Sequence, residues 1–270
     1  MGDELEKARV VALKATAGPY SLLRGAFFGN AVPSVTKPDC SLVTDFDKVA
    51  EGHIIKAIQS EFPTHDILAE ESGGKIGDGY TWLIDALDGT TNFVKKNPIF
   101  SIALTLLYRR EPIFALVCCP ILDDWYTGAK GKGAYLNGKP LCVSNVKSLS
   151  DALLGFNKGR KQEDFTRWYG AAKYLGGKAR SIRMFGSSAY TICQIAAGRL
   201  DGEVNVGGSS WDTIGPALIL KEAGGRATNF RGELISTETT DFLFTNGKIH
   251  NEALEALEVL TVPPGTVTLH

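Results

Sequence analysis

The segment WLIDALDGTTNF, residues 82–93, combines an apolar run with two acids, a glycine and two hydroxyl residues. Residues 81–85 predict a strand that ends at Asp85, and Asp88 follows three residues later. Two carboxylates at one strand end can converge on a hard cation such as Mg²⁺, which takes oxygen ligands. The Gly89-Thr90-Thr91 step predicts a helix start whose backbone N–H groups face an anion. The segment therefore predicts a metal site beside a phosphate site, although an Asp-Gly turn and a threonine cap explain the same letters.

Three further segments place acids where an element begins or ends. Glu70 and Glu71 close the predicted strand 66–71, and alternation predicts that only one of them, Glu70, aims inward. Asp212 precedes the predicted helix 213–223 and is interpreted as its N-cap, with Pro216 in the first turn. Asp45 and Asp47 are predicted to share one face, where solvated surface acids are the simpler reading.

The remaining pattern predicts an α/β (α+β) body in layers. The hydrophobic periodicity predicts helices at 5–28 (with a kink or break at Gly18-Pro19), 49–62, 163–175, 189–197, 213–223 and 251–260. Strands are predicted at 66–71, 81–85, 100–108, 112–120, 152–156 and 241–246. Arg109-Arg110-Glu111 predicts a hairpin connection, and Asn137-Gly138 predicts a tight turn of type I′. We expect two lobes, 1–145 and 146–262, and a flexible tail at 263–270.

Composition excludes several classes of function. The chain has 270 residues and a net charge of −1, which predicts neither a nucleic-acid partner nor binding to an anionic membrane. The five cysteines show no zinc spacing and suit reduced thiols, and the charged N-terminus is no signal peptide, so we expect a cytoplasmic protein. The four histidines lie outside the acidic segments, which argues against a histidine-nucleophile phosphatase.

Taken together and in order, these segments resemble the inositol monophosphatase family over about residues 5–260. DALDGTTNF at 85–93 is similar to the family's D-P-[IL]-D-G-T-T-N-F, and Trp211-Asp212 with ILKEAGG at 219–225 is similar to its second signature. The letters AEES at 69–72, GSSA at 186–189 and KGAYLNG at 132–138 resemble further family segments.

The resemblance implies a layered α-β-α-β-α sandwich of the sugar phosphatase type, inhibition by lithium and a homodimer. It implies two to three Mg²⁺ ions, held by Glu70, Asp85, the Leu87 carbonyl, Asp88 and Asp212. It also implies that Glu70 and Thr90, assisted by Asp47, orient the attacking water, and that Gly89 and Thr90 amides bind phosphate. Implied substrate contacts are Asp88, Arg183, Ser187, Ser188, Asn205 and Asp212; capping or solvation explains Arg183 and the two serines equally well.

The expected activity is hydrolysis of a small polyol or sugar phosphate, with inositol-1-phosphate as the first candidate, by a water that metal ions activate. Alternatives are a fructose-1,6-bisphosphatase, a histidinol-phosphatase, a 3′-phosphonucleotide phosphatase or a catalytically silent binding homologue. Lys158, Arg160, Lys161 and Arg183 are candidate partners for a second phosphate. Two positions depart from the family. Ala86 replaces a proline, which predicts a looser loop, and Asn205 stands where a glutamate often contacts substrate hydroxyls.

Overall fold

The computed structural model describes residues 2–261, so the predicted tail 263–270 lies outside the described residues. The helices are α1 (Gly2–Phe28), α2 (Asp45–Glu61), α3 (Thr90–Val94), α4 (Gln162–Tyr174), α5 (Ser188–Ala196), α6 (Ser210–Glu222) and α7 (His250–Thr261), with a 3-10 turn η1 (Leu149–Asp151). Within the described range, no helix is both long enough and apolar enough to cross a bilayer.

Two sheets form the frame, beside a small pair of β1 (Val35–Thr36) and β2 (Leu42–Val43). The first sheet has the order β10-β9-β8-β7-β6-β5-β3-β4 and is antiparallel except where β3 runs parallel to β5. Its strands are β3 (Asp66–Ala69), β4 (Gly73–Gly74), β5 (Tyr80–Asp88), β6 (Ser101–Tyr108), β7 (Glu111–Cys119), β8 (Asp124–Ala129), β9 (Gly133–Leu136) and β10 (Lys139–Pro140). The second has the order β12-β11-β13-β15-β14, with β11 (Leu153–Lys158), β12 (Ser181–Arg183), β13 (Gly202–Val206), β14 (Arg226–Thr228) and β15 (Asp241–Thr245).

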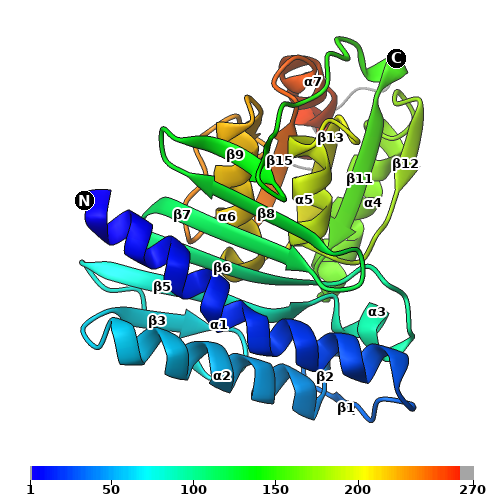
Figure 1. Cartoon of the computed structure of the whole chain (residues 1–270). Helices are drawn as coiled ribbons and strands as arrows, with labels where there is room; N and C mark the ends of the chain where they lie inside the picture. The colour runs from blue at the N-terminus through cyan, green and yellow to red at the C-terminus, as the bar shows by residue number, and fades with distance from the viewer. Residues whose placement is uncertain (1, 262–270) are drawn as a thin grey trace.

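The helices cover these sheets in alternating layers (Figure 1). Helices α1 and α2 pack together on one face of the first sheet, and α5 and α6 lie between the two sheets. Helices α4 and α7 pack on the outer face of the second sheet. The predicted α-β-α-β-α sandwich is therefore confirmed.

Most local predictions are confirmed, with shifted ends. Helix α1 runs unbroken through Pro19, so the predicted break is wrong. Arg109 and Arg110 both have positive φ, as do Asn137 and Gly138, which is the backbone of type I′ hairpin turns. All five cysteines are free; Cys118, Cys119 and Cys193 are buried.

The two predicted lobes share their middle layer. The predicted boundary at 145/146 falls between β10 and η1. The buried cluster around α5 and α6 includes Ala103 and Val117 from the first sheet and Phe242 and Phe244 from the second. The division into two lobes stays a prediction, and any site between the sheets draws on both halves of the chain.

A glycine sets how closely α6 approaches the first sheet. A Cβ atom on Gly215 would lie 1.9 Å from the Thr105 hydroxyl oxygen and 3.3 Å from the Cβ of Ala115. Thr105 is fully buried on β6, so it has no room to move away. Only glycine therefore lets this turn of α6, which also carries Asp212, sit directly on β6 and β7.

We expect Gly215→Ala to lower the free energy of unfolding by about 1–3 kcal/mol, because it overpacks this contact. The control is Gly52→Ala on the exposed side of α2, where a Cβ meets nothing within 4 Å. The control should gain about 0.5–1 kcal/mol from helix propensity. Urea unfolding measures both, and equal effects of the two substitutions would contradict the close approach of α6.

Candidate active site

An extra residue in β5 brings Asp85 and Asp88 to the same face of the first sheet. Asp85 pairs with Ala103 and Asp88 pairs with Ser101, so three steps along β5 match two steps along β6. This is a β-bulge, and it cancels the alternation that would otherwise send the two side chains to opposite faces. Ala103 belongs to the cluster around α5 and α6, so both carboxylates face the layer between the sheets.

The bulge corrects two predictions. The strand does not end at Asp85 but continues to Asp88. Ala86 is buried within the bulged strand rather than in a loose loop. The backbone N–H of Leu87 donates to the Asp85 carboxylate at 2.9 Å, which holds that side chain against the bulge.

The carboxylate of Asp88 is bound by the N-terminus of α5. It accepts hydrogen bonds from the Ser187 hydroxyl, from the backbone N–H groups of Ser188 (3.2 Å) and Ala189 (2.9 Å), and from the Ser101 hydroxyl (3.1 Å). Burial raises the pKa of Asp88, and these donors oppose that shift. A helix N-terminus favours a negative charge, so this contact joins the first sheet to the middle layer.

Asp212 approaches the same region from α6. The N-cap residue of α6 is Ser209, and the Ser209 N–H donates to the Asp212 carboxylate at 3.2 Å in a capping box. Asp212 is thus the third helical residue, so its prediction as N-cap is wrong, and Pro216 lies further inside the helix than predicted. Burial and then the negative charges of Asp88 and Glu70 raise the pKa of Asp212 well above its usual value.

Glu70 and Glu71 share one cation, Lys37. The Lys37 ammonium lies 3.1 Å from the Glu70 carboxylate and also contacts Glu71. The prediction that adjacent acids face opposite ways is wrong here, because β3 ends at Ala69 and both glutamates lie in the turn that follows. The buried Glu51 of α2 fixes this turn by accepting the N–H groups of Glu71 (2.8 Å) and Ser72 (2.9 Å).

Asp47 of α2 and Thr90 of α3 are in direct contact. The Thr90 hydroxyl lies 3.0 Å from Asp47 and 3.1 Å from the Leu87 carbonyl oxygen. Helix α2 starts at Asp45, earlier than predicted, and Asp47 closes a capping box with Thr44. Strand alternation therefore does not apply to Asp45 and Asp47: Asp45 is exposed and Asp47 is buried. Burial raises the pKa of Asp47, against hydrogen bonds from Thr44 and Thr90.

Gly89 lets the chain turn between β5 and α3. Its φ is +94°, and a Cβ atom there would lie 3.2 Å from the carbonyl oxygens of Gly186 and Ile99. The Asn92 amide donates to the carbonyls of Ile99 and Phe185, both at 2.6 Å. Gly89 and Thr90 are thus held beside the segment that precedes α5.

The residues predicted to contact substrate separate into two groups. Ser187 and Ser188 lie at the α5 N-terminus against Asp88, and the Asn205 amide donates to the Ser188 hydroxyl oxygen at 2.9 Å. Arg183 is not brought to this group: it is exposed, and its guanidinium donates to Ser181 and to the carbonyl of Ile182.

The acidic side chains lie close enough to repel one another. Burial, and then the charges of Glu70, Asp88 and Asp212, raise the pKa of Asp85 well above its usual value. In the part of the chain that the structure describes, no three acidic, histidine or cysteine side chains already stand in a metal-holding arrangement. Carboxylate oxygens that repel one another are nevertheless suitable ligands for a divalent cation. For Glu70 to join them, its carboxylate would have to leave the Lys37 ammonium.

Sequence reasoning missed several residues that shape this site. Lys37 and Glu51 stand alone in their segments, and no spacing marks them. Ser101 is found only when the register of β5 and β6 is known. Glu203 on β13 accepts from Asn205 at 3.2 Å; its position two residues before Asn205, in the alternating run EVNV, was a usable signal.

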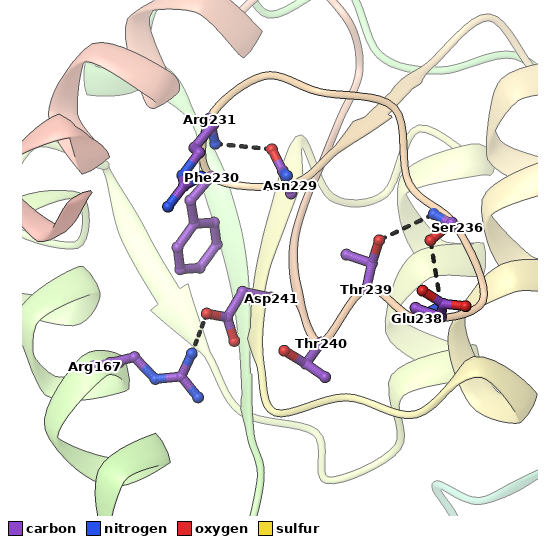
Figure 2. Close-up of a pocket in the computed structure, with 9 residues that line it drawn as sticks. All are labelled: Arg167, Asn229, Phe230, Arg231, Ser236, Glu238, Thr239, Thr240 and Asp241. Carbon is purple, nitrogen blue, oxygen red and sulfur yellow. Dashed lines mark hydrogen bonds and ion pairs between the residues drawn. The ribbon is translucent and has the colours of Figure 1, made fainter.

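A pocket of about 450 Å³ lies elsewhere, between α4 and the start of β15 (Figure 2). Arg167, Phe230, Arg231 and Asp241 are among the residues that line it, and none of the predicted site residues does. Arg167 is bound to Asp241, whose other oxygen accepts the Gly207 N–H at 3.1 Å. This cluster supports the loop that leads to α6.

The chain has close relatives in sequence. The model of the inositol monophosphatase family matches residues 4–261. Inositol monophosphatase 3 of Solanum lycopersicum is 38% identical over 258 residues, which cover 92% of this chain and 95% of that relative. Nus factor SuhB of Pseudomonas aeruginosa is 33% identical over 256 residues, covering 92% of this chain and 94% of that relative.

The fold is shared with solved structures. The structure of inositol monophosphatase from Anabaena matches with a TM-score of 0.84 and 31% identity, covering 97% of this chain and 99% of that one. The family match, the relatives and the fold agree over nearly the whole chain. The chain therefore belongs to the inositol monophosphatase family and is a phosphoric monoester hydrolase.

Proposed function

We propose that this phosphatase uses Mg²⁺ to release phosphate from inositol-1-phosphate. One observation carries the proposal: Asp85 and Asp88 of β5, Glu70 after β3 and Asp212 of α6 lie close together beside the Thr90–Asp47 pair. The charges of the other three acids raise the pKa of Asp85, and those of Asp88 and Glu70 raise the pKa of Asp212. Such repulsion between neighbouring acids, two of them buried and two partly buried, is typical of a functional site rather than of a structural ion pair.

The metal ligands in this proposal are the carboxylates of Glu70, Asp85, Asp88 and Asp212 and the carbonyl oxygen of Leu87, with two to three ions. Asp85 is shared between ions. When bound, Mg²⁺ supplies positive charge that polarises phosphoryl oxygens and acidifies water. The chain's task is to hold these oxygens in place, and the bulge in β5, the α5 N-terminus and the α6 capping box do so.

Thr90 and Asp47 orient the water that attacks phosphorus. Because the Thr90 hydroxyl donates a hydrogen bond to Asp47 or to the Leu87 carbonyl, its oxygen lone pairs are left to accept a hydrogen bond from water. When Leu87 binds a cation, Asp47 remains as the acceptor. Glu70 shares the orienting role, and the N–H groups of Gly89 and Thr90 bind the phosphate. Positioning of this kind accounts for much of the catalysis in phosphoryl transfer.

Inositol-1-phosphate is favoured over a bisphosphate. Inositol monophosphatase is the name that several relatives carry. The Arg183 guanidinium donates to groups of its own strand, and the Lys161 ammonium lies 3.8 Å from the Glu163 carboxylate. Two of the cations considered for a second phosphate thus have other partners. Asp88, Asp212, Ser187, Ser188 and Asn205 remain as proposed substrate contacts; Arg183 would have to turn to join them.

The other parts of the proposal are carried by the family resemblance and by composition. They are a homodimer, inhibition by lithium and a cytoplasmic location. Some relatives carry the name Nus factor SuhB or putative Nus factor SuhB. The net charge of −1 gives this chain little attraction for nucleic acid, so we propose a small phosphorylated metabolite as its partner and neither nucleic acid nor membrane.

We expect a panel of phosphate esters with Mg²⁺ to show the highest kcat/KM for inositol-1-phosphate. The panel contains fructose-1,6-bisphosphate, histidinol phosphate and a 3′-phosphonucleotide, and EDTA should abolish phosphate release from each. A preference for another ester would replace the proposed substrate. No turnover of any ester would favour a catalytically silent homologue.

Asp85→Asn should lower kcat by about 10³-fold, because the shared metal ligand loses its charge. In EDTA the variant should unfold at the same temperature as the natural protein or higher, since one of several repelling charges is gone. Added Mg²⁺ should raise the melting temperature of the natural protein but not that of the variant. Near-full turnover of Asp85→Asn would rule out the metal assignment.

Thr90→Val and Thr90→Ser form a matched pair around the hydroxyl group. The valine variant keeps the shape but should lose about 10²-fold or more in kcat, because nothing orients the water. The serine variant keeps the hydroxyl and should stay within about tenfold of the natural enzyme. Steady-state phosphate release decides, and equal losses in the two variants would speak against a role for the hydroxyl.

A further inference from the structure

A buried polar stripe runs along the second sheet on its site-facing side. Alternation in β13 sends Val204 and Val206 into the outer cluster beneath α4 and α7. Glu203 and Asn205 therefore point the other way, towards α5, where an apolar side chain would be expected. Both are about 1% exposed. Asn157 pairs with Asn205 across β11 and β13 and faces the same side.

Glu203 is the acceptor that ties this stripe together. One carboxylate oxygen accepts the Asn157 amide at 2.7 Å and the Asn205 amide at 3.2 Å. Its other oxygen is buried without a partner among the described residues. Keeping an incompletely bonded buried acid is unfavourable, so packing alone does not explain its presence.

The two amide hydrogens of Asn205 are both used. One goes to Glu203, and the other goes to the Ser188 hydroxyl oxygen at 2.9 Å. The carbonyl oxygen of Asn205 must then point away from Glu203 and Ser188. It lies close to Gly208, where an added Cβ atom would be 2.7 Å from it. Gly208 precedes Ser209, whose N–H binds Asp212, while the Ser188 N–H binds Asp88. The carbonyl oxygen thus lies beside the segment that holds Asp212, while the amide nitrogen lies beside the segment that holds Asp88.

Of its two hydrogen-bond partners, only Glu203 fixes which end of the Asn205 amide, NH₂ or carbonyl, faces the stripe. A serine hydroxyl both donates and accepts, so Ser188 would bind either the NH₂ or the carbonyl end of Asn205. Glu203 presents its bonded oxygen as an acceptor to two amides, and it therefore accepts only the NH₂ end of Asn205. Without this acceptor the amide can turn over and offer a donor in place of an acceptor.

We propose that Glu203 is a specificity-determining positioning residue, which holds Asn205 so that its carbonyl oxygen accepts a hydroxyl of the substrate. The inference rests on the proposed function and deepens it: it names the chemical class selected, a phosphate ester with a hydroxyl group beside the ester. Glu203 itself touches no substrate. It acts through Asn205, and Asn157 helps to hold it.

The charge of Glu203 is not needed for this role. Burial raises the pKa of Glu203 to about 8, against the hydrogen bonds from Asn157 and Asn205. Near neutral pH the group is thus largely protonated, and glutamine is its close match in shape and charge. Glu203→Gln keeps a carbonyl acceptor, whereas Glu203→Leu removes it.

The test compares inositol-1-phosphate with 4-nitrophenyl phosphate, which has no hydroxyl group. In Glu203→Leu we expect KM for inositol-1-phosphate to rise about five- to tenfold, with kcat within about twofold, as for the loss of one hydrogen bond. KM for 4-nitrophenyl phosphate should stay within about twofold. Glu203→Gln should restore the natural KM for both esters.

Gln194→Leu is the matched control for removing a buried polar group. Gln194 lies on α5 and donates to the Tyr126 hydroxyl at 2.9 Å, outside the stripe. Its loss should lower stability but leave both KM values unchanged. If Glu203→Leu raises KM equally for both esters, leaves both unchanged, or is not rescued by glutamine, the proposal is overturned.

Failure of the proposed function gives a different pattern. If the natural enzyme hydrolyses 4-nitrophenyl phosphate but not inositol-1-phosphate, the substrate is wrong, and the best hydroxylated ester of the panel takes its place. If no ester is turned over, the side-chain amide NMR signal of Asn205 decides. In the natural protein and in Glu203→Gln, this amide should be protected from hydrogen exchange, and in Glu203→Leu it should be unprotected. An unprotected signal in the natural protein overturns the proposal.

Discussion

The extra residue in β5 between Asp85 and Asp88 is the constraint on which the candidate site depends. Without it, two acids three residues apart in a strand would face opposite sides of the sheet. With it, both face the middle layer, where α5 and α6 add their own groups. The bulge is held from within by the Leu87 N–H on Asp85, so the feature that aims the carboxylates is also stabilised by one of them.

Carboxylates gathered in this way oppose folding, and the surrounding structure offsets them with donors. The Asp88 carboxylate accepts hydrogen bonds from the α5 N-terminus and from two serine hydroxyls, and the Asp212 carboxylate accepts one from the Ser209 N–H. Glu70 receives Lys37, which supplies a positive charge beside the cluster. These donors compensate only in part, because the pKa values of Asp85 and Asp212 stay well above their usual range. The remaining repulsion is what a divalent cation would relieve, so the proposed binding of metal would also stabilise the fold.

The layers, the hairpin turns and the acidic residues could be predicted because each has a local signal: a period, a turn pair or a motif. The predicted side-chain directions are wrong where an element starts or ends at a different residue than predicted. Strand alternation fails for Asp45 and Asp47 because they belong to a helix that starts at Asp45. It fails for Glu70 and Glu71 because they lie past the end of β3. The bulge, the pairing of Lys37 and the register of Ser101 depend on contacts between distant segments, which spacing along the chain does not encode.

The proposed site also divides the groups for chemistry from the groups for substrate recognition along the chain. Most of the groups proposed to bind metal and phosphate come from β5, α3 and the turn after β3, and only Asp212 comes from the second half. The groups that would contact the rest of the substrate come from α5 and β13. Asp88 is the link, because it belongs to β5 and is bound by α5. Changes in the polar stripe of β13 could therefore alter which hydroxyl is recognised while the carboxylates stay in place, since the stripe reaches Asp88 only indirectly. One route runs through Ser188, and the other runs from Asn157 through Thr191 to Ser187.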